Sequence, residues 1–278
     1  MTDPQNPGAP SRSASSIEVG SPSLQTLRHY TPARVALAQA GVSIATQPQL
    51  EFQLDHALAR DAVHARLDIA SLSDGLKRLN LDPITLRSAI PAGPDERRTY
   101  LLRPDLGRRL SPESAQALGA PSQSASSIEV GCDLVFTLAD GLSALAIDRH
   151  AIPLLEATLP LLAGWSIGPV CIVQQGRVAI GDEIGELLHA RALVMLLGER
   201  PGLSAPDSLG VYITWNPRPG RTDAERNCIS NIRLEGLSYA DAAQRILAIL
   251  TGARQLGASG VALREETQHK VHEGYTKE

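Results

Sequence analysis

Four short apolar runs in the second half of the sequence constrain the fold most strongly. They are CDLVFTLA (132–139), PVCIVQQ (169–175), ALVMLLG (192–198) and GVYITW (210–215). None shows the strict alternation of a strand with one wet face, and continuous apolar runs are typical of strands covered on both faces. We therefore expect a sheet that is buried between two layers of helices.

Helical segments separate some of these runs. Residues 150–164, interrupted by Pro160, and DEIGELLHA (182–190) are two of them. A last helix is expected to begin at Ser238, where a capping-box pattern starts, and Gly257 can end it. Strands interleaved with helices imply right-handed crossovers, so the fold class is α/β with a mainly parallel, Rossmann-like doubly wound sheet in the C-terminal half.

The first half of the chain is expected to be helical. Residues 51–68 place apolar side chains at helical spacing, and SLSDGLKRLN favours a shorter helix capped by Ser71 or Ser73. Ser111 is the predicted cap of a further helix with Pro112 in its first position, which tolerates proline because that N–H has no helical partner.

A stretch of 12 residues occurs twice with one difference, as APSRSASSIEVG (9–20) and APSQSASSIEVG (120–131). Its serine-rich half favours no packed element, so we interpret the repeat as a duplicated or engineered linker in preference to a binding module. The predicted organisation is a flexible, disordered N-terminal tail (1–28), a helical N-terminal region (29–119), the linker repeat (120–131), an α/β domain (132–265) and a flexible C-terminal tail (266–278).

Composition excludes several classes of function. With a net charge of −4 and 3% aromatic residues, the chain is a poor candidate for binding nucleic acid or a membrane surface. Its 3 cysteines form no CxxC pair, so neither a zinc site nor a disulfide framework is expected. The N-terminus lacks the pattern of a secretory signal, and the longest apolar runs are too short to span a bilayer. A reducing cytoplasm is the expected location.

Three loops follow the predicted strand ends: ADGLSA (139–144), QGRVAIGDE (175–183) and GERPGLSAPDS (198–208). In parallel sheets, ligands bind in the crevice outside these carboxyl ends. Each loop combines glycine, which lets the backbone approach a ligand closely, with polar or charged residues. From composition alone, a ligand site and plain connecting turns are about equally supported.

Familiar catalytic patterns are absent. The sequence has no GxGxxG, GxxxxGK[ST] or HExxH, and Ser143 has no glycine two positions after it, so no nucleophile elbow forms. This argues against an independent hydrolase or nucleotide enzyme. DRHAIP partly matches the DxHxxG of some corrinoid proteins, but Pro153 replaces the glycine. We favour Asp148 as a helix cap with His150 in the first turn.

Five motifs carry a family resemblance: RTYLLRPDLGRRL, LADGLSALA, GRVAIGDEIGELL, LLGERPGLSAPDSLGVYITWNPR and RNCISNI. In this order and spacing they resemble the small (light) subunit of ethanolamine ammonia-lyase, over about residues 31–263. The resemblance implies an adenosylcobalamin enzyme in which a large barrel subunit and a small subunit form a hetero-oligomer. The complex converts ethanolamine to acetaldehyde and ammonia by a radical mechanism. The small subunit closes over the cofactor at the interface.

The resemblance assigns no catalytic and no metal-ligating residue to this chain, and it makes residues 132–265 the cobalamin-contacting domain. The cofactor contacts that it implies are Val178, Glu199 and Cys228, followed by Arg177, Arg200 and Gly202. AQAG (38–41) replaces the family's GRAG, and the N-terminal tail lacks the helix that directs some relatives into a bacterial microcompartment, which leaves encapsulation open. The alternative is a non-catalytic corrinoid-binding or scaffolding module without a lyase partner.

Overall fold

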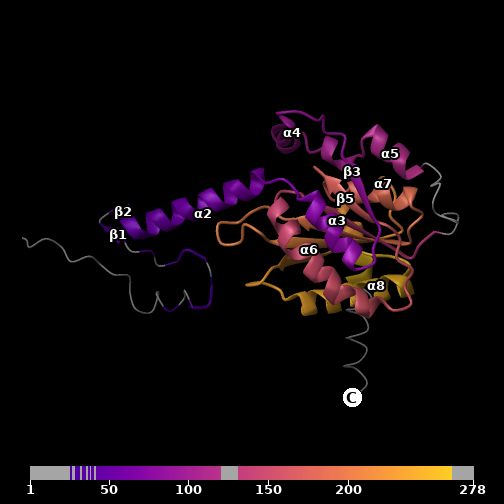
Figure 1. The fold of residues 1–278 in the computed structure, drawn as a ribbon. Helices are drawn as coiled ribbons and strands as arrows, with labels where there is room; N and C mark the ends of the chain where they lie inside the picture. Colours follow the sequence, from indigo (N-terminus) through magenta and orange to yellow (C-terminus); the bar gives the residue numbers. More distant parts are fainter. Residues whose placement is uncertain are drawn as a thin grey trace, which may run out of the picture. The chain divides into compact units, whose positions relative to one another are not determined.

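The structure, a computed structural model, describes residue 26, short pieces of 29–40, and residues 42–119 and 131–264 (Figure 1). The described pieces of 29–40 are residues 29–31, 33–35, 37 and 39–40. Nearly all of the N-terminal tail, all but the last residue of the linker repeat's second copy, and all of the C-terminal tail lie outside the described residues. The chain forms two compact units, residues 1–57 and 58–278. No helix in the described ranges is long and apolar enough to cross a membrane.

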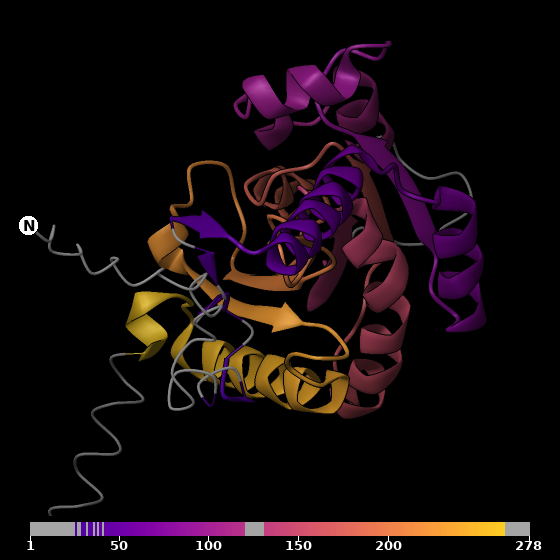
Figure 2. The ribbon, with the colours of Figure 1, turned by 90° about the vertical axis from the view of Figure 1, so that its left-hand side faces the viewer.

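The first unit contains a small antiparallel pair and most of one helix. Strands β1 (Gln39–Ala40) and β2 (Ser43–Ile44) pair with each other, and α2 (Thr46–His64) follows. The helix predicted at 51–68 is confirmed in position, but it begins and ends earlier than expected. Within the unit, Arg34 pairs with Asp55 and lies over the ring of Phe52 at 5.4 Å. In Figure 2 the strands and the helix can be followed in indigo.

The second unit is built on a six-stranded sheet with the order β3-β5-β4-β6-β7-β8. Its strands are β3 (Pro83–Arg87), β4 (Leu134–Ala139), β5 (Val170–Gln174), β6 (Ala192–Gly198), β7 (Leu209–Trp215) and β8 (Arg226–Ile232). Strands β3, β5, β4 and β6 are parallel to one another. Strand β7 pairs antiparallel with β6, and β8 pairs antiparallel with β7. The predicted α/β class with a mainly parallel sheet is therefore confirmed, and the four predicted strands correspond to β4–β7.

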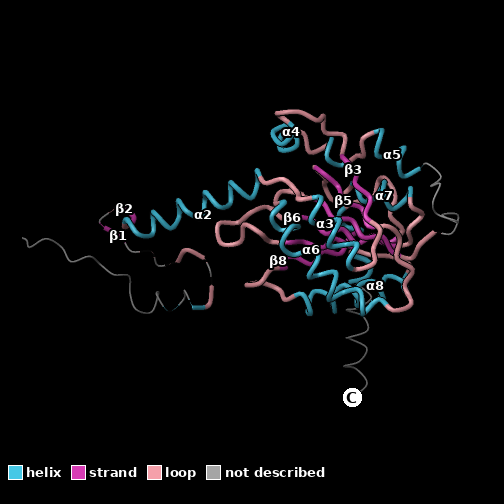
Figure 3. Tube along the Cα trace, viewed as in Figure 1, coloured by secondary structure: helices cyan, strands magenta, loops and turns pink. Residues whose placement is uncertain are grey.

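Helices cover both faces of this sheet (Figures 1 and 3). On one face α3 (Ile69–Arg78), α6 (Ala144–Thr158) and α8 (Tyr239–Leu256) share a core with alternate strand residues such as Phe136 and Ile172. On the other face α5 (Pro112–Gly119) and α7 (Ile180–Leu187) pack on the intervening residues, including Val135 and Val173. Strand β4, which is apolar apart from Thr137, and the apolar strand β6 are thus buried on both sides, as their composition predicts.

The N-terminal region is not purely helical, which corrects the expectation for residues 29–119. Besides α4 (Glu96–Leu102), it supplies β3, which pairs in parallel with β5 at one edge of the sheet. The sequence PITLR mixes polar and apolar residues, since an edge strand is only partly covered, and so it gave no continuous apolar run. The second unit consequently begins at Leu58 and includes part of the region that the sequence placed before the α/β domain.

Three of the predicted helix ends are confirmed, and one is wrong. Ser111 accepts from the Ser114 N–H at 3.2 Å, and Ser238 accepts from Asp241, so both predicted caps are confirmed. Gly257 ends α8 with a φ of 73°, also as expected. The predicted Ser71 or Ser73 cap is wrong, because Asp68 caps α3 by accepting from the Ser71 N–H.

The interpretation of DRHAIP as a helix start is also wrong. Ser143 caps α6 through its side chain, so Asp148 and His150 lie inside the helix. Asp148 instead accepts a hydrogen bond from the Asp68 N–H at 3.2 Å. The 3-10 segment η3 (Leu159–Leu162) follows α6 where Pro160 was expected to interrupt the helix.

Candidate functional site

The three predicted loops meet at the carboxyl ends of the strands, where the order of strand addition reverses. Strand β4 lies in the middle, with β5 on one side and β6 on the other. The Leu142 N–H donates to the Gly198 carbonyl at 2.9 Å. A Cβ at Gly141, whose φ is 52°, would lie 2.3 Å from that carbonyl oxygen. The close crossing therefore requires glycine, and the prediction that the loops share one edge of the sheet is confirmed.

A cavity of about 800 Å³ opens beside this crossing. It lies next to the start of α7, and its wall continues over Tyr212 of β7. Most of the rest comes from the three loops, the turn before β8 and the segment after α4. The lining residues are Pro104, Arg108, Gly141, Leu142, Arg177, Val178, Ala179, Leu197, Gly198, Glu199, Arg200, Tyr212, Arg221, Thr222, Asp223 and Arg226.

The six residues named from the sequence are only partly brought together. Four of them line the cavity: Arg177, Val178, Glu199 and Arg200. Cys228 does not line it, but it is exposed on β8 directly opposite Tyr212, which does. Gly202 lies in a tight turn in which its N–H donates to the Ala205 carbonyl at 3.1 Å, and it is absent from the lining.

The Glu199 side chain is held in one direction. Its Oε2 accepts hydrogen bonds from the Ser208 hydroxyl and, at 3.3 Å, from the Asn231 N–H. The carboxylate rests on the backbone of β7, because a Cβ at Gly210 would lie 2.8 Å from Oε1. Among the described residues Oε1 has no hydrogen-bond partner, so it is available to a donor on a ligand.

Five arginines line the same cavity as this acceptor. Arg108 and Arg200 are exposed, and neither guanidinium pairs with a carboxylate in the described ranges. In contrast, Arg221 pairs with Glu225, and the buried Arg226 forms a bidentate pair with Asp182 at 2.6 and 2.7 Å. The fifth lining arginine, Arg177, donates to the Tyr100 carbonyl at 3.4 Å, so the groups left for anions or carbonyl oxygens of a ligand are those of Arg108 and Arg200.

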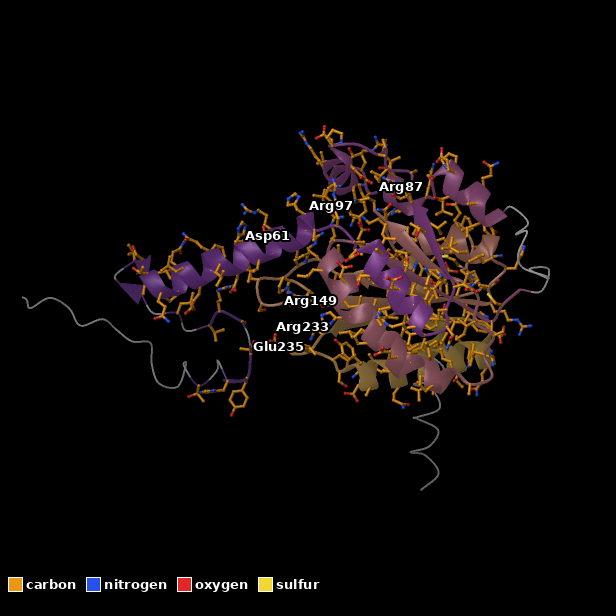
Figure 4. All side chains as sticks on the ribbon, in the orientation of Figure 1. Asp61, Arg87, Arg97, Arg149, Arg233 and Glu235 are labelled. Carbon is orange, nitrogen blue, oxygen red and sulfur yellow. The ribbon has the colours of Figure 1, made fainter. Side chains whose placement is uncertain are left out.

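Sequence reasoning missed a buried cluster that fastens the segment after β3 onto the strand ends. Arg97 donates to the Gly141 carbonyl at 3.1 Å and faces the Asp140 carboxylate at 3.5 Å. Two guanidinium groups lie over the Tyr100 ring, that of Arg97 at 4.8 Å and that of Arg177 at 4.2 Å from its centroid, and the Tyr100 hydroxyl donates to the Gly176 carbonyl at 2.9 Å. Figure 4 labels Arg97 in this region.

Burial raises the pKa of Asp140 to about 7, against the opposing effect of Arg97. The only local signal for this cluster was a polar residue directly after a buried strand. Its partners come from a distant segment, so nothing near Asp140 in the sequence pointed to them. The cluster is structural support for the cavity edge, since Arg97, Tyr100 and Asp140 are not among the lining residues.

The arrangement is suited to binding and orienting a large polar ligand. It combines a carboxylate acceptor, free guanidinium donors, glycine-rich backbone and an apolar wall at Val178 and Leu197. Within the described part of the chain, the lining includes no histidine, cysteine, lysine or serine, and its one aliphatic hydroxyl group belongs to Thr222. A self-sufficient nucleophile with an adjacent base is therefore not found in this cavity.

Comparison with known proteins gives consistent results. The family described as "Ethanolamine ammonia-lyase light chain (EutC)" matches residues 21–264. A protein of Pseudomonas aeruginosa (strain UCBPP-PA14) named ethanolamine ammonia-lyase small subunit is 53% identical over 250 residues, which cover 89% of each chain. One of the same name from Azotobacter vinelandii is 54% identical over 246 residues, 88% of each chain.

Proposed function

The chain belongs to the ethanolamine ammonia-lyase light-chain family, and on this premise we propose how it acts in a carbon–nitrogen lyase. It is the small subunit of a complex with a large barrel subunit, and it closes over adenosylcobalamin at their interface. The complex converts ethanolamine to acetaldehyde and ammonia.

The observation that carries the proposal is the convergence of Arg177, Val178, Glu199 and Arg200 on one cavity without a nucleophile and base of its own. The proposal treats the sheet as Rossmann-like, with the ligand at the switch point between β4 and β6. A site that binds but lacks its own reacting groups is expected when the substrate is held by a partner subunit.

The residues present fit the chemistry of a cobalamin. Its corrin side chains carry amides, and its nucleotide part carries a phosphate and ribose hydroxyls. Glu199 Oε1 is free to accept from an amide or hydroxyl, and Arg108 and Arg200 are free to donate to a phosphate or an amide carbonyl. Gly141 and Gly198, where the two loops cross, have no side chain, so a ligand can approach the backbone closely at this point.

Each implied contact then has a physical role. Val178 supplies an apolar wall, Glu199 fixes orientation by accepting hydrogen bonds, and Cys228, beside Tyr212, offers a small soft surface next to the cavity. Arg177 is held by the Tyr100 ring and contributes mainly by shaping the wall. Gly202 stays a prediction whose contribution is the turn of the loop. When bound, adenosylcobalamin supplies the radical that the family's reaction requires.

The proposal places the complex in the cytoplasm, where the free state of Cys132, Cys171 and Cys228 is stable. Reconstitution tests the function. The full chain, a large subunit of the family and adenosylcobalamin are expected to produce acetaldehyde from ethanolamine, and omission of either subunit is expected to abolish it. A well-folded complex without activity would leave the non-catalytic corrinoid-binding module as the better description.

A second arm tests the site. Glu199→Ala is expected to raise the concentration of adenosylcobalamin required for half-maximal activity by about 10-fold, because it removes a charged acceptor, while the KM for ethanolamine changes little. Glu113→Ala, at an exposed position in α5, is the matched control. Equal cofactor requirements in the two variants would remove Glu199 from the site.

A further inference from the structure

The loop that carries Glu199 and Arg200 depends on few contacts with the body of the unit. Residues 199–208 connect β6 to β7, and the Glu199 N–H donates to the Ser208 carbonyl at 2.9 Å across the base. Farther out, the Ser143 hydroxyl donates to the Pro206 carbonyl at 2.9 Å. The remaining polar attachment of the loop to the helical layer, within the described residues, is the side chain of Asp207.

Asp207 is attached to a buried histidine. His150, in the middle of α6 and 2% exposed, places its Nε2 3.3 Å from Asp207 Oδ2. Its Nδ1 lies 2.8 Å from the hydroxyl of Tyr239, the first residue of α8. One imidazole therefore connects the start of α8, the middle of α6 and the loop next to the cavity.

The chemistry of the two partners fixes the direction of these bonds. An ionised Asp207 can only accept, so His150 Nε2 carries the hydrogen and donates to it. In the neutral ring Nδ1 is then the acceptor, and the Tyr239 hydroxyl donates to it. Both hydrogen bonds can therefore form while the imidazole is neutral, with no additional proton on the ring.

The surrounding charges are consistent with this assignment. Burial lowers the pKa of His150, and it outweighs Asp207, which raises it; Arg149 and Arg233 lower it further (Figure 4). Burial acts to raise the pKa of Asp207, but the hydrogen bonds of Arg149 and His150 hold that pKa below its ordinary value. Arg149 itself is about half exposed, at 54%, so its ion pair with Asp207 is screened.

We propose that His150 is a positioning residue, which passes hydrogen bonds from Tyr239 to Asp207 and thereby holds the 199–208 loop where Glu199 and Arg200 line the cavity. The effect on the loop needs no assumption about the ligand. The effect on cobalamin rests on the proposed function. His150 does not touch the cavity, so it acts through Asp207 alone.

Three variants of the full chain, each assembled with its large subunit, separate the possibilities. His150→Leu fills the space but removes both hydrogen bonds. His150→Gln keeps one donor and one acceptor at similar reach, and it cannot become charged. Arg149→Gln removes only the exposed ion pair with Asp207 and serves as the matched control.

Amide hydrogen exchange of the complex without cofactor is the first readout. His150→Leu is expected to speed exchange in residues 200–207 by about 5-fold, because the loop loses one hydrogen bond, the one between His150 and Asp207. Strands β4 and β6 are expected to stay as protected as in the wild type. His150→Gln is expected to restore protection to within about 2-fold, and Arg149→Gln to leave it unchanged. Unchanged exchange in His150→Leu would overturn the proposal, as would equal loosening in the Gln variant.

Tyr239→Phe covers the case in which His150→Leu fails to fold, because it removes one hydroxyl from the edge of the helix. It is expected to give part of the same loosening, and no loosening would overturn the relay. Adenosylcobalamin affinity is the second readout, with a loss of about 5-fold for His150→Leu and recovery for His150→Gln. If the loop loosens but neither wild type nor variants bind cobalamin, the proposed function fails while the positioning role stands.

Discussion

The buried pair of Arg226 and Asp182 provides the sharpest test of how the cavity wall is held. Their side chains are 2% and 3% exposed, and two hydrogen bonds of 2.6 and 2.7 Å join them. Arg226 also donates to the Thr214 hydroxyl at 3.0 Å and to the Arg221 carbonyl at 3.0 Å. It therefore fixes β7, α7 and the turn before β8 together.

Arg226→Met leaves the Asp182 carboxylate buried without its partner. Removing one member of a buried pair costs about 3–5 kcal/mol, because the remaining charge is left uncompensated. For a unit of about this size, each kcal/mol lowers Tm by about 2–4 °C, so we expect a loss of about 6–20 °C. Thermal unfolding of the full chain at pH 7, followed by circular dichroism, measures this loss.

The double variant Asp182→Leu with Arg226→Met is the control. Replacing both members with apolar residues is often neutral, so Tm is expected to return to within about 4 °C of the wild type. A Tm loss below about 3 °C for Arg226→Met alone would refute the view that this pair is a closed, desolvated one.

Three further predictions follow from single positions. Gly210→Ala is expected to displace the Glu199 carboxylate, since the new Cβ would lie 2.8 Å from Oε1, and to weaken adenosylcobalamin binding several-fold in a titration of the complex. Gly119→Ala is the neutral control, because a Cβ at this position at the end of α5 would meet no atom within 4 Å. Gly198→Ala should prevent the loops from crossing, because its Cβ would lie 2.0 Å from the Ser143 carbonyl oxygen, and soluble, cooperatively melting protein would contradict this. The folded-state pKa of Asp140, about 7, exceeds its unfolded value, so between about pH 4 and 7 the folded state binds more protons and stability falls as pH rises. Urea unfolding should show that Asp140→Asn gains stability relative to wild type across this window; a pH-independent difference would assign Asp140 an ordinary pKa.

The sequence predicted the centre of the fold better than its edges. Strands β4 and β6 consist of apolar residues with the single exception of Thr137, and this pattern follows directly from burial on both faces. Strands β3 and β8 mix polar with apolar residues because each lies at an edge, and RNCISNI was recognised as a family motif but not as a strand. The composition of β7 does not show its antiparallel direction; the signal lies in the connection 199–208, which is too short for a helical crossover.

The site divides in the same way. That three loops share an edge follows from parallel strands, and it required no knowledge of side chains. The orientation of Glu199 depends on Ser208, Asn231 and the missing side chain of Gly210, none of which is close enough in sequence to give a local pattern. His150 was misplaced because an aspartate before a helical run resembles a cap, whereas Ser143 provides the cap one turn earlier.

Hydrogen exchange of the assembled complex with and without adenosylcobalamin tests most directly whether this chain closes over the cofactor. Cofactor is expected to slow exchange in the three cavity loops, 139–144, 175–183 and 198–208, and to leave the exposed end of α5 unchanged. Protection confined to the large subunit, with these loops exchanging at the same rate in both states, would contradict a cofactor contact at this cavity.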